Sequence, residues 1–304
     1  MSCLFVILIV LIVLIVFILY NKYIEYYSQI LNKRKFPDYT RWILSDKYVA
    51  KQYAEMNGFH IPTTYQVVKY PKDIDFSKIP KNYVVKPIDL CSSYGVYLVK
   101  NNINLITNKK VSNKKIVKNL NLLRAKVNNS YYMHDLMYNN LVPYTGYIVE
   151  ELLLDNGEIP HDYKCYTFNG RIYLIALTFN RRIVKGKQLF DSIWVTRDWN
   201  PIYFSMIKKN YKYTNIKKPP EYDLLIEKVE NISSKLNRHC RIDVYCLNKK
   251  IYFGEFTFFC GATLHTFLCN LILGIIWILN PDDYNSYDKS IDKLVPSYYN
   301  NPYN

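Results

Sequence analysis

The strongest hydrophobic pattern along the chain is an uninterrupted apolar run near its N-terminal end. The run CLFVILIVLIVLIVFILY, residues 3–20, contains no charged residue, proline or glycine. A helix needs about 20 apolar residues to cross the hydrocarbon core of a bilayer. A cleaved signal peptide normally has a basic start and a small-residue cleavage site, and this run has neither. The pattern therefore predicts a transmembrane helix over residues 3–20, with a cleaved signal peptide as the alternative.

The basic residues near this run predict its orientation. Lys22, Lys33, Arg34 and Lys35 all follow the run, and no basic side chain precedes it. Cytoplasmic flanks of membrane helices carry an excess of lysine and arginine. We therefore expect the large domain to face the cytoplasm.

A second apolar run covers residues 267–279. It is only about 13 residues long, shorter than a membrane span requires, and contains Asn270 and Gly274. The length favours a buried helix. A contact with the surface of the same membrane is the alternative.

Between the two runs, helical and strand-like periodicities alternate. Helices are expected from Ser45 or Asp46 to Gly58, over 112–127 and over 222–236. The strand-like runs are 64–69, 83–87, 95–100, 147–153, 163–168, 172–178, 241–246 and 251–258. This mixture predicts an α+β fold. The predicted organisation is an anchor at 3–20, a juxtamembrane linker at 21–40, one domain at 41–280 and a C-terminal tail at 281–304.

Composition and charge limit the kinds of partner. Half of the 304 residues are hydrophobic, which is enough for a packed core, and the net charge of +15 favours anionic partners such as nucleotide phosphates, acidic lipid or nucleic acid. The seven cysteines and five histidines show no zinc-site spacing. We read the cysteines as reduced thiols of a cytosolic domain.

Three of the predicted strands carry polar side chains two residues apart, so both members of each pair lie on one strand face. The pairs are Asp162 with Lys164, Arg241 with Asp243, and Glu255 with Thr257.

Folding the last two strands into a hairpin about Lys249 brings Asp243 to within about one residue of lying opposite Glu255. Two neighbouring carboxylates repel unless a cation lies between them, and oxygen ligands of this kind suit Mg²⁺. The alternative is a pair of unrelated acids on a solvated surface hairpin.

A further strand, YVVK, ends at Lys86 and leads into the segment PIDLCSSYGV. Small hydroxyl residues and a glycine after a strand can form a loop whose backbone N–H groups face phosphate. A plain surface turn explains the same residues equally well.

Taken together, these segments resemble the ATP-grasp superfamily. The resemblance covers roughly residues 40–265 and is carried by SDKYVAK, GFHIPT, VVKP…SSYGVYLVK, YIVEEL, HDYKCYTFNGR and RIDVY…KIYFGEFTFFCGAT, in that order. The FNGR segment and the FDSIWVTRDWN stretch that follows it are most similar to the TupA-like, teichuronopeptide-biosynthesis branch.

The resemblance implies roles for particular residues, with ATP and one or two Mg²⁺ ions as cofactors. Contact with the α- and β-phosphates is implied for Lys47 and Lys86, and a loop over the phosphates for Ser92, Ser93 and Gly95. The implied hinge against adenine is Glu150, Glu151 and Leu152, with Asp162 near the ribose. Lys164 would face phosphate, Arg241 would stabilise the transition state, and the implied metal ligands are Asp243, Glu255 and Thr257.

Two departures from the family pattern stand out. The loop carries Asp89-Leu90-Cys91 where relatives are richer in glycine, which should stiffen it. Thr257 stands where Asn is a common ligand and would bind a metal more weakly.

The resemblance implies a membrane-anchored, ATP- and Mg²⁺-dependent ligase that joins a carboxylate to an amine through an acyl phosphate, in surface-polymer or glycan synthesis. Arg181 and Arg182 are candidates for contacting the acidic substrate. The alternatives are a catalytically degenerate nucleotide-binding module and a basic membrane protein that binds nucleic acid. Of the anionic partners, we favour nucleotide over nucleic acid.

Overall fold

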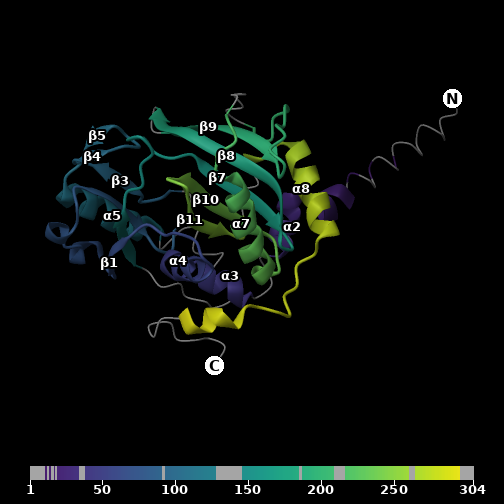
Figure 1. Ribbon diagram of the computed structural model, residues 1–304, viewed down its shortest axis with the longest axis horizontal. Coiled ribbons are helices and arrows are strands. Elements are labelled where there is room, and N and C mark those ends of the chain that lie inside the picture. The colour runs from purple at the N-terminus through teal and green to yellow at the C-terminus, as the bar shows by residue number, and fades with distance from the viewer. Residues whose placement is uncertain are drawn as a thin grey trace.

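The fold is built from two antiparallel sheets and the helices that cover them (Figure 1). The computed structural model describes residues 11, 14, 17, 19–33, 38–90, 93–127, 146–184, 187–208, 216–259 and 264–294. The expected α+β class is confirmed.

The first sheet has six strands in the order β1-β6-β2-β3-β4-β5. They are β1 (Thr64–Val68), β2 (Asn82–Pro87), β3 (Tyr97–Lys100), β4 (Ile103–Asn104), β5 (Lys109–Lys110) and β6 (Tyr147–Glu151). Helix α5 (Asn113–Val127) buries Ile116 and Leu120 against side chains of this sheet such as Val85 and Val99. These contacts form the core of this half of the fold.

The second sheet has five strands in the order β11-β10-β7-β8-β9. They are β7 (Asp162–Phe168), β8 (Arg171–Val184), β9 (Lys187–Thr196), β10 (Cys240–Leu247) and β11 (Lys250–Thr257). Successive residues of a strand point to opposite faces, and β9 shows this directly. Ile193 and Val195 enter one hydrophobic core, whereas Trp194 enters another.

Two sets of helices make these cores. Helices α3 (Tyr39–Leu44), α4 (Lys47–Met56) and α7 (Tyr222–Leu236) contribute to the core on one face, and α2 (Tyr26–Lys33) and α8 (Phe267–Leu279) to the core on the other. Because both faces are covered, most strand residues of this sheet are apolar. Polar strand residues on it therefore need an explanation of their own.

Helix α4 begins and ends where the sequence predicts. The Asp46 carboxylate caps its first turn by accepting hydrogen bonds from the Tyr48 and Val49 N–H groups at 2.7 and 3.1 Å. Gly58 follows the helix with φ +81°, a backbone conformation that glycine adopts without strain. Below this cap, Tyr53 packs on Phe256 of β11, so α4 is attached to the five-stranded sheet.

Helices α5 and α7 and most of the expected strands are also confirmed. The short strands β4 and β5 were not predicted. Between residues 171 and 196, β8 runs on to Val184 and β9 was not predicted. The polar residues Asn180, Arg181 and Arg182 interrupt the apolar alternation there. Their side chains find partners within the fold, with Asn180 and Arg182 both contacting Asp191 of β9.

The predicted linker at 21–40 is wrong, because most of this range is helical. It contains the short helix η1 (Tyr20–Ile24), α2 and the start of α3, and Tyr26 and Ile30 of α2 are fully buried against α8. The predicted tail is also packed in part. Within it, η5 (Lys289–Leu294) places Ile291 in the main core.

The predicted anchor at 3–20 lies largely outside the described residues. No helix in the described part of the chain is both long and apolar enough to cross a membrane. Leu11, Leu14, Phe17 and Leu19, which are described, are helical and between 46% and 62% exposed.

Two buried histidines generate a prediction about acid stability. His239 accepts or donates hydrogen bonds at Tyr26 Oη and Thr167 O, and burial lowers the pKa of His239 to about 4 and that of His265 to about 3. The unfolded chain binds these protons near pH 6.5, so stability should fall as the pH drops from about 6.5 towards 4, by about 1.4 kcal/mol per pH unit for each imidazole. Urea unfolding across this pH range measures it.

The variant His239→Gln cannot titrate and should show a shallower pH dependence. The exposed His60→Gln serves as its control and should follow the parent. Equal slopes for the parent and His239→Gln would contradict the role of this imidazole in acid stability.

Candidate functional site

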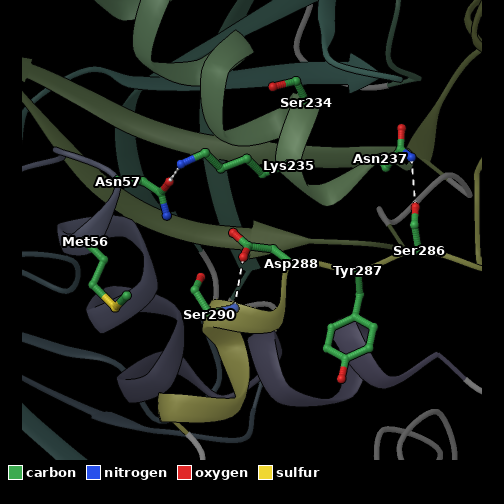
Figure 2. Close-up of a pocket in the computed structure, with 9 residues that line it drawn as sticks. All are labelled: Met56, Asn57, Ser234, Lys235, Asn237, Ser286, Tyr287, Asp288 and Ser290. Carbon is green, nitrogen blue, oxygen red and sulfur yellow. Dashed lines mark hydrogen bonds between the residues drawn. The ribbon is translucent and has the colours of Figure 1, made fainter.

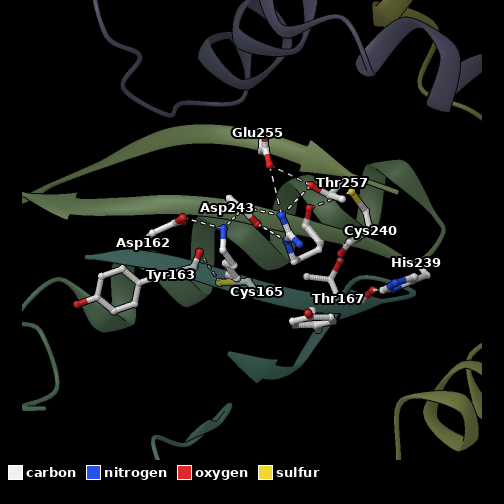
Figure 3. A network of polar contacts seen from close by, with 12 residues as sticks. Asp162, Tyr163, Cys165, Thr167, His239, Cys240, Asp243, Glu255 and Thr257 are labelled. Atoms are coloured by element: carbon white, nitrogen blue, oxygen red, sulfur yellow. Dashed lines mark hydrogen bonds and ion pairs between the residues drawn. The ribbon is translucent and has the colours of Figure 1, made fainter. Parts of the chain in front are cut away.

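A network of charged side chains lies on one face of the five-stranded sheet, on strands β7, β10 and β11 (Figure 3). Lys164 lies opposite Asp243 in the register of β7 and β10, and Asp243 lies opposite Glu255 in the register of β10 and β11. The predicted juxtaposition of Asp243 and Glu255 is confirmed. It follows from the short turn between β10 and β11, which sets the register.

A bulge between Asp243 and Val244 adjusts this register. Gly254, on the partner strand, makes the adjustment possible. A Cβ atom at this position would lie 2.9 Å from the carbonyl oxygen of Asp243, too close for any side chain.

The Asp243 carboxylate is buried and held by two cations. Arg241 donates through Nε to Oδ1 at 2.6 Å and through Nη2 to Oδ2 at 2.8 Å, while Lys164 Nζ donates to Oδ2 at 2.5 Å. Burial alone would raise the pKa of Asp243. The charges of Arg241 and Lys164 outweigh burial and hold that pKa below its usual value, so Asp243 is an anion at neutral pH.

Arg241 shows where a cation fits in this network. Its Nη2 contacts Asp243, the Glu255 Oε1 at 3.3 Å and the Thr257 Oγ1 at 3.0 Å. These are the three side chains predicted to bind Mg²⁺, and here they converge on one positive group. The described residues contain no cluster of three or more His, Cys, Asp or Glu side chains suited to a metal. Asp243, Glu255 and Thr257 together offer two carboxylates and a hydroxyl. These are hard oxygen donors of the kind that suit Mg²⁺, with phosphate or water as the remaining ligands of the ion.

The network extends along β7 to Asp162 and across to β8. Asp162 Oδ2 accepts from Lys164 Nζ at 2.7 Å and from Arg181 Nη2, and its other oxygen, Oδ1, is buried without a hydrogen-bond partner. Arg181, proposed from sequence as a substrate contact, thus joins the same network. Arg182 lies apart from it, 3.2 Å from Asp191.

A second charged cluster belongs to the six-stranded sheet. Glu150 of β6 is buried, with Lys86 Nζ of β2 at 2.6 Å from Oε1 and Lys51 Nζ of α4 at 2.5 Å from Oε2. Burial opposes the charge of Glu150, but Lys51 and Lys86 hold its pKa below the usual value. Burial lowers the pKa of Lys51 to about 8, against the attraction of Glu150.

Lys51 is the residue that sequence reasoning missed. Its side chain is 2% exposed, whereas that of Lys86 is 15% exposed, so Lys86 is the cation of the pair that a ligand can reach. The sequence did offer a signal, because Lys51 is four residues after Lys47 and therefore lies on the same face of the helix. Lys47 itself donates to the Ile88 and Leu90 carbonyl oxygens.

The expected hinge residues lie at the end of β6. The backbone of Glu150 is paired with β1 on one side and β2 on the other, and the Glu151 N–H donates to Thr63 O at 2.9 Å. The Glu150 side chain binds Lys51 and Lys86. The expected contact of Glu150, Glu151 and Leu152 with adenine stays a prediction.

The predicted phosphate loop is described in part, because Ser92 and Cys91 lie outside the described residues. Ser93 and Gly95 have φ of +59° and +71°, which marks a tight turn. The start of the loop is held firmly: Arg124 of α5 makes two hydrogen bonds to Asp89, at 2.6 and 2.7 Å. This ion pair fixes Asp89 to α5, whereas the stiffening expected for Asp89-Leu90-Cys91 stays a prediction.

A separate pocket of about 490 Å³ lies elsewhere, between the ends of α4 and α7 and the segment leading into η5 (Figure 2). Its polar lining includes Asn57, Lys235, Asn237 and Asp288, and none of the predicted site residues. Lys235 already donates to Asn57 Oδ1 at 2.7 Å. The two charged clusters, and not this pocket, carry the groups that phosphate chemistry needs.

The Glu150 cluster predicts a large effect on stability. Removing the carboxylate leaves Lys51 buried without a partner, so Glu150→Gln should lower the free energy of unfolding by about 3–5 kcal/mol. Urea unfolding at pH 7 measures this. The exposed acid Glu227 provides the matched control, and Glu227→Gln should change stability by less than about 0.5 kcal/mol. Similar effects of the two substitutions would contradict the inferred role of Glu150.

Comparison with solved structures finds distant likeness to ligases. D-alanine–D-alanine ligase from Bacillus anthracis complexed with ATP is 14% identical with a TM-score of 0.41, over 73% of this chain and 59% of that chain. VanG D-Ala:D-Ser ligase from Enterococcus faecalis is 13% identical with a TM-score of 0.43, over 83% of this chain and 61% of that chain. The matched region thus spans less than two thirds of either enzyme. No curated protein matches the chain.

A family model described as TupA-like ATPgrasp matches residues 28–271, which include both sheets and every site residue considered above. The match also begins within α2, in agreement with the packing of that helix against the fold. The chain therefore belongs to the TupA-like ATP-grasp family.

Proposed function

We propose that the protein is an ATP- and Mg²⁺-dependent ligase that joins a carboxylate to an amine. The observation that carries this proposal is the charged network on β7, β10 and β11, where Arg241, Asp243 and Glu255 meet on one sheet face. A solvated surface hairpin would not bury Asp243 to 2% exposure with two cations on it. Family membership supports the same chemistry.

The reaction has two balanced steps. An oxygen of the substrate carboxylate bonds to the γ-phosphorus of ATP as the bond from that phosphorus to ADP breaks, which gives an acyl phosphate. The amine nitrogen then attacks the acyl carbon, inorganic phosphate leaves with the electrons of the broken C–O bond, and the amine loses a proton to solvent. The protein contributes positioning and charge stabilisation, which supply most of the catalysis in phosphoryl transfer.

The chain's own residues divide these tasks. Lys86, the more accessible cation on Glu150, would contact phosphate, and the turn at Ser93 and Gly95 would lie over it. Lys164 and Arg241 lie next to Asp243, and in this proposal they would face the negative charge that develops on the transferred group.

Asp243, Glu255 and Thr257 would hold Mg²⁺, which when bound neutralises phosphate charge. Glu255 is 40% exposed, so it is the ligand most open to incoming phosphate. The substrate carboxylate belongs, in this proposal, to a precursor of a surface polymer or glycan, and Arg181 is a candidate to contact it.

We also propose that residues 3–20 anchor the domain to a membrane from its cytoplasmic side. The support is the unbroken apolar sequence and the basic residues that follow it. An alkaline carbonate wash of membranes from cells that express the full chain should leave the protein in the pellet, because such a wash releases peripheral proteins only. Release into the supernatant would overturn the anchor.

Substitutions in the two charged clusters should affect different quantities, the rate of ADP release and the affinity for MgATP. Glu255→Gln keeps shape but removes a metal-ligand charge, so the rate of ADP release should fall on the order of a thousandfold while nucleotide binding persists. Lys86→Met should instead weaken MgATP binding by roughly tenfold or more, since one charge-assisted hydrogen bond contributes about 1.5–3 kcal/mol. The assays are ADP release with amino acids, acidic peptides and uronic acids as substrates, and calorimetric titration with MgATP.

Glu255→Gln tests the metal site more directly than Asp243→Asn does. Asp243→Asn should abolish turnover too, but it also removes two buried ion pairs, so its folding must be checked. Asp198→Asn, 73% exposed, is the matched control and should behave as the parent. Undiminished ADP release in Glu255→Gln would refute the metal assignment. Nucleotide binding without turnover in the parent, under all substrates, would favour a degenerate binding module.

A further inference from the structure

The outward face of helix α8 is apolar and exposed. Phe267, Leu268, Ile275, Ile278 and Leu279 are 63%, 40%, 44%, 49% and 72% exposed. At about 100° per residue these five side chains cover roughly 120° of the helix circumference, so they form one continuous stripe. We call this stripe the α8 face.

Helix α8 is apolar on its exposed face as well as on its buried face, unlike a helix at a protein–water boundary. Such a helix directs its apolar stripe inward and its polar residues outward. Here Asn270 carries the only side-chain amide of the helix, and it is buried at 6% exposure. A short helix with large apolar residues outward and its amide inward is matched to a surrounding that is not water.

Neighbouring segments extend the apolar surface at the start of the helix. Thr266, the N-cap of α8, donates from Oγ1 to Ser205 O at 2.8 Å, which brings residues 203–205 beside it. Tyr203, Phe204 and Leu264 are 70%, 41% and 49% exposed. Scattered apolar side chains are common on protein surfaces, but a grouping of this kind marks an interaction site.

The place where the N-terminal apolar run enters the fold lies against the same helix. The rings of Tyr20 and Phe267 are 4.8 Å apart, and Gln29 Nε2 donates to both Ile24 O and Gly274 O at 2.9 and 3.0 Å. The contact is close: a Cβ atom on Gly274 would lie 1.7 Å from Ile24 O. In Figure 1, α8 and α2 lie together at one edge of the fold.

We propose that the α8 face lies in the interfacial layer of a lipid bilayer, the same bilayer that residues 3–20 are proposed to enter. This inference rests on the proposed anchor, because the apolar run directly before Tyr20 identifies lipid, among possible partners, as the one next to α8. Helix α8 is roughly 20 Å long, too short to cross a hydrocarbon core of about 30 Å, so it lies on the membrane. The exposed Lys22 and Lys208 border this region and favour anionic headgroups.

The consequence is a fixed orientation of the domain. A single helical anchor lets a domain rotate, whereas two adjacent contacts restrict it. Helix α8 packs on the five-stranded sheet through Leu273 and Trp277, on the sheet face that also carries Lys164. The membrane contact would therefore orient the candidate site relative to the lipid surface.

The test uses the full chain in vesicles of phosphatidylcholine and phosphatidylglycerol, with and without brominated phosphatidylcholine. Ile278→Trp adds an indole on the α8 face, and Tyr70→Trp adds one at a site 51% exposed on the six-stranded sheet side. After subtraction of the parent's fluorescence, the bromolipid should quench most of the signal added at residue 278 and little of that added at residue 70. A signal at 278 that resists bromolipid and is quenched by aqueous acrylamide, as at 70, would overturn the proposal.

Two further measurements distinguish a lipid contact from a contact between copies of the chain. Adding Ile275→Glu to Ile278→Trp should remove most of the bromolipid quenching, because a carboxylate is excluded from the interface, while carbonate-resistant anchoring through residues 3–20 persists. If Ile275→Glu instead converts a dimer into a monomer in detergent, the α8 face is a contact between copies and the proposal fails. Neither readout needs turnover, so failure of the ligase proposal would leave both unchanged.

Discussion

The buried carboxylate of Asp243 sets the constraint on which the candidate site depends. An anion with 2% exposure in the middle of a sheet is tolerated only where cations and hydrogen bonds compensate the loss of water. Lys164 and Arg241 provide this compensation from neighbouring positions of β7 and β10. The register of three strands, the bulge at Asp243 and the absence of a side chain at Gly254 all serve to keep these groups together.

A second buried carboxylate, that of Glu150, is also compensated by cations, and its ion pairs join the two halves of the fold. Helix α4 packs against β11 through Tyr53 and reaches into the six-stranded sheet through Lys51, which is paired with Glu150. Lys86 completes the pairing from β2 and is the member of this cluster with some exposure. The ion pairs of Glu150 with Lys51 and Lys86 therefore connect the two sheets through α4.

The N-terminal part of the chain is more closely integrated with the domain than its sequence indicates. Tyr26 and Ile30 are fully buried, and Tyr26 makes a hydrogen bond with His239, 213 residues later in the chain. Residues 20–33, which follow the apolar run, are thus part of the domain and pack closely against α8 at Gly274. A membrane-bound N-terminus would be coupled to the five-stranded sheet through this rigid contact.

Local patterns in the sequence determined much of this protein. The cap at Asp46, the extents of α5 and α7, and the juxtaposition of Asp243 and Glu255 all follow from interactions between residues close along the chain. Helix periodicity, capping and a short hairpin turn need no knowledge of distant segments. The ATP-grasp resemblance likewise arose from short motifs in a fixed order, and the family match agrees with it.

Tertiary structure alone decided the rest, because those features join residues far apart in sequence. Lys51 and Glu150 are 99 residues apart, and nothing local to either predicts the pair. The burial of Tyr26 and Ile30 depends on α8, more than 200 positions later, so a linker and a packed helix look alike in the local sequence. In the same way the composition of α8 showed that the helix is apolar, but only its packing against α2 and the five-stranded sheet determined which of its apolar side chains remain exposed.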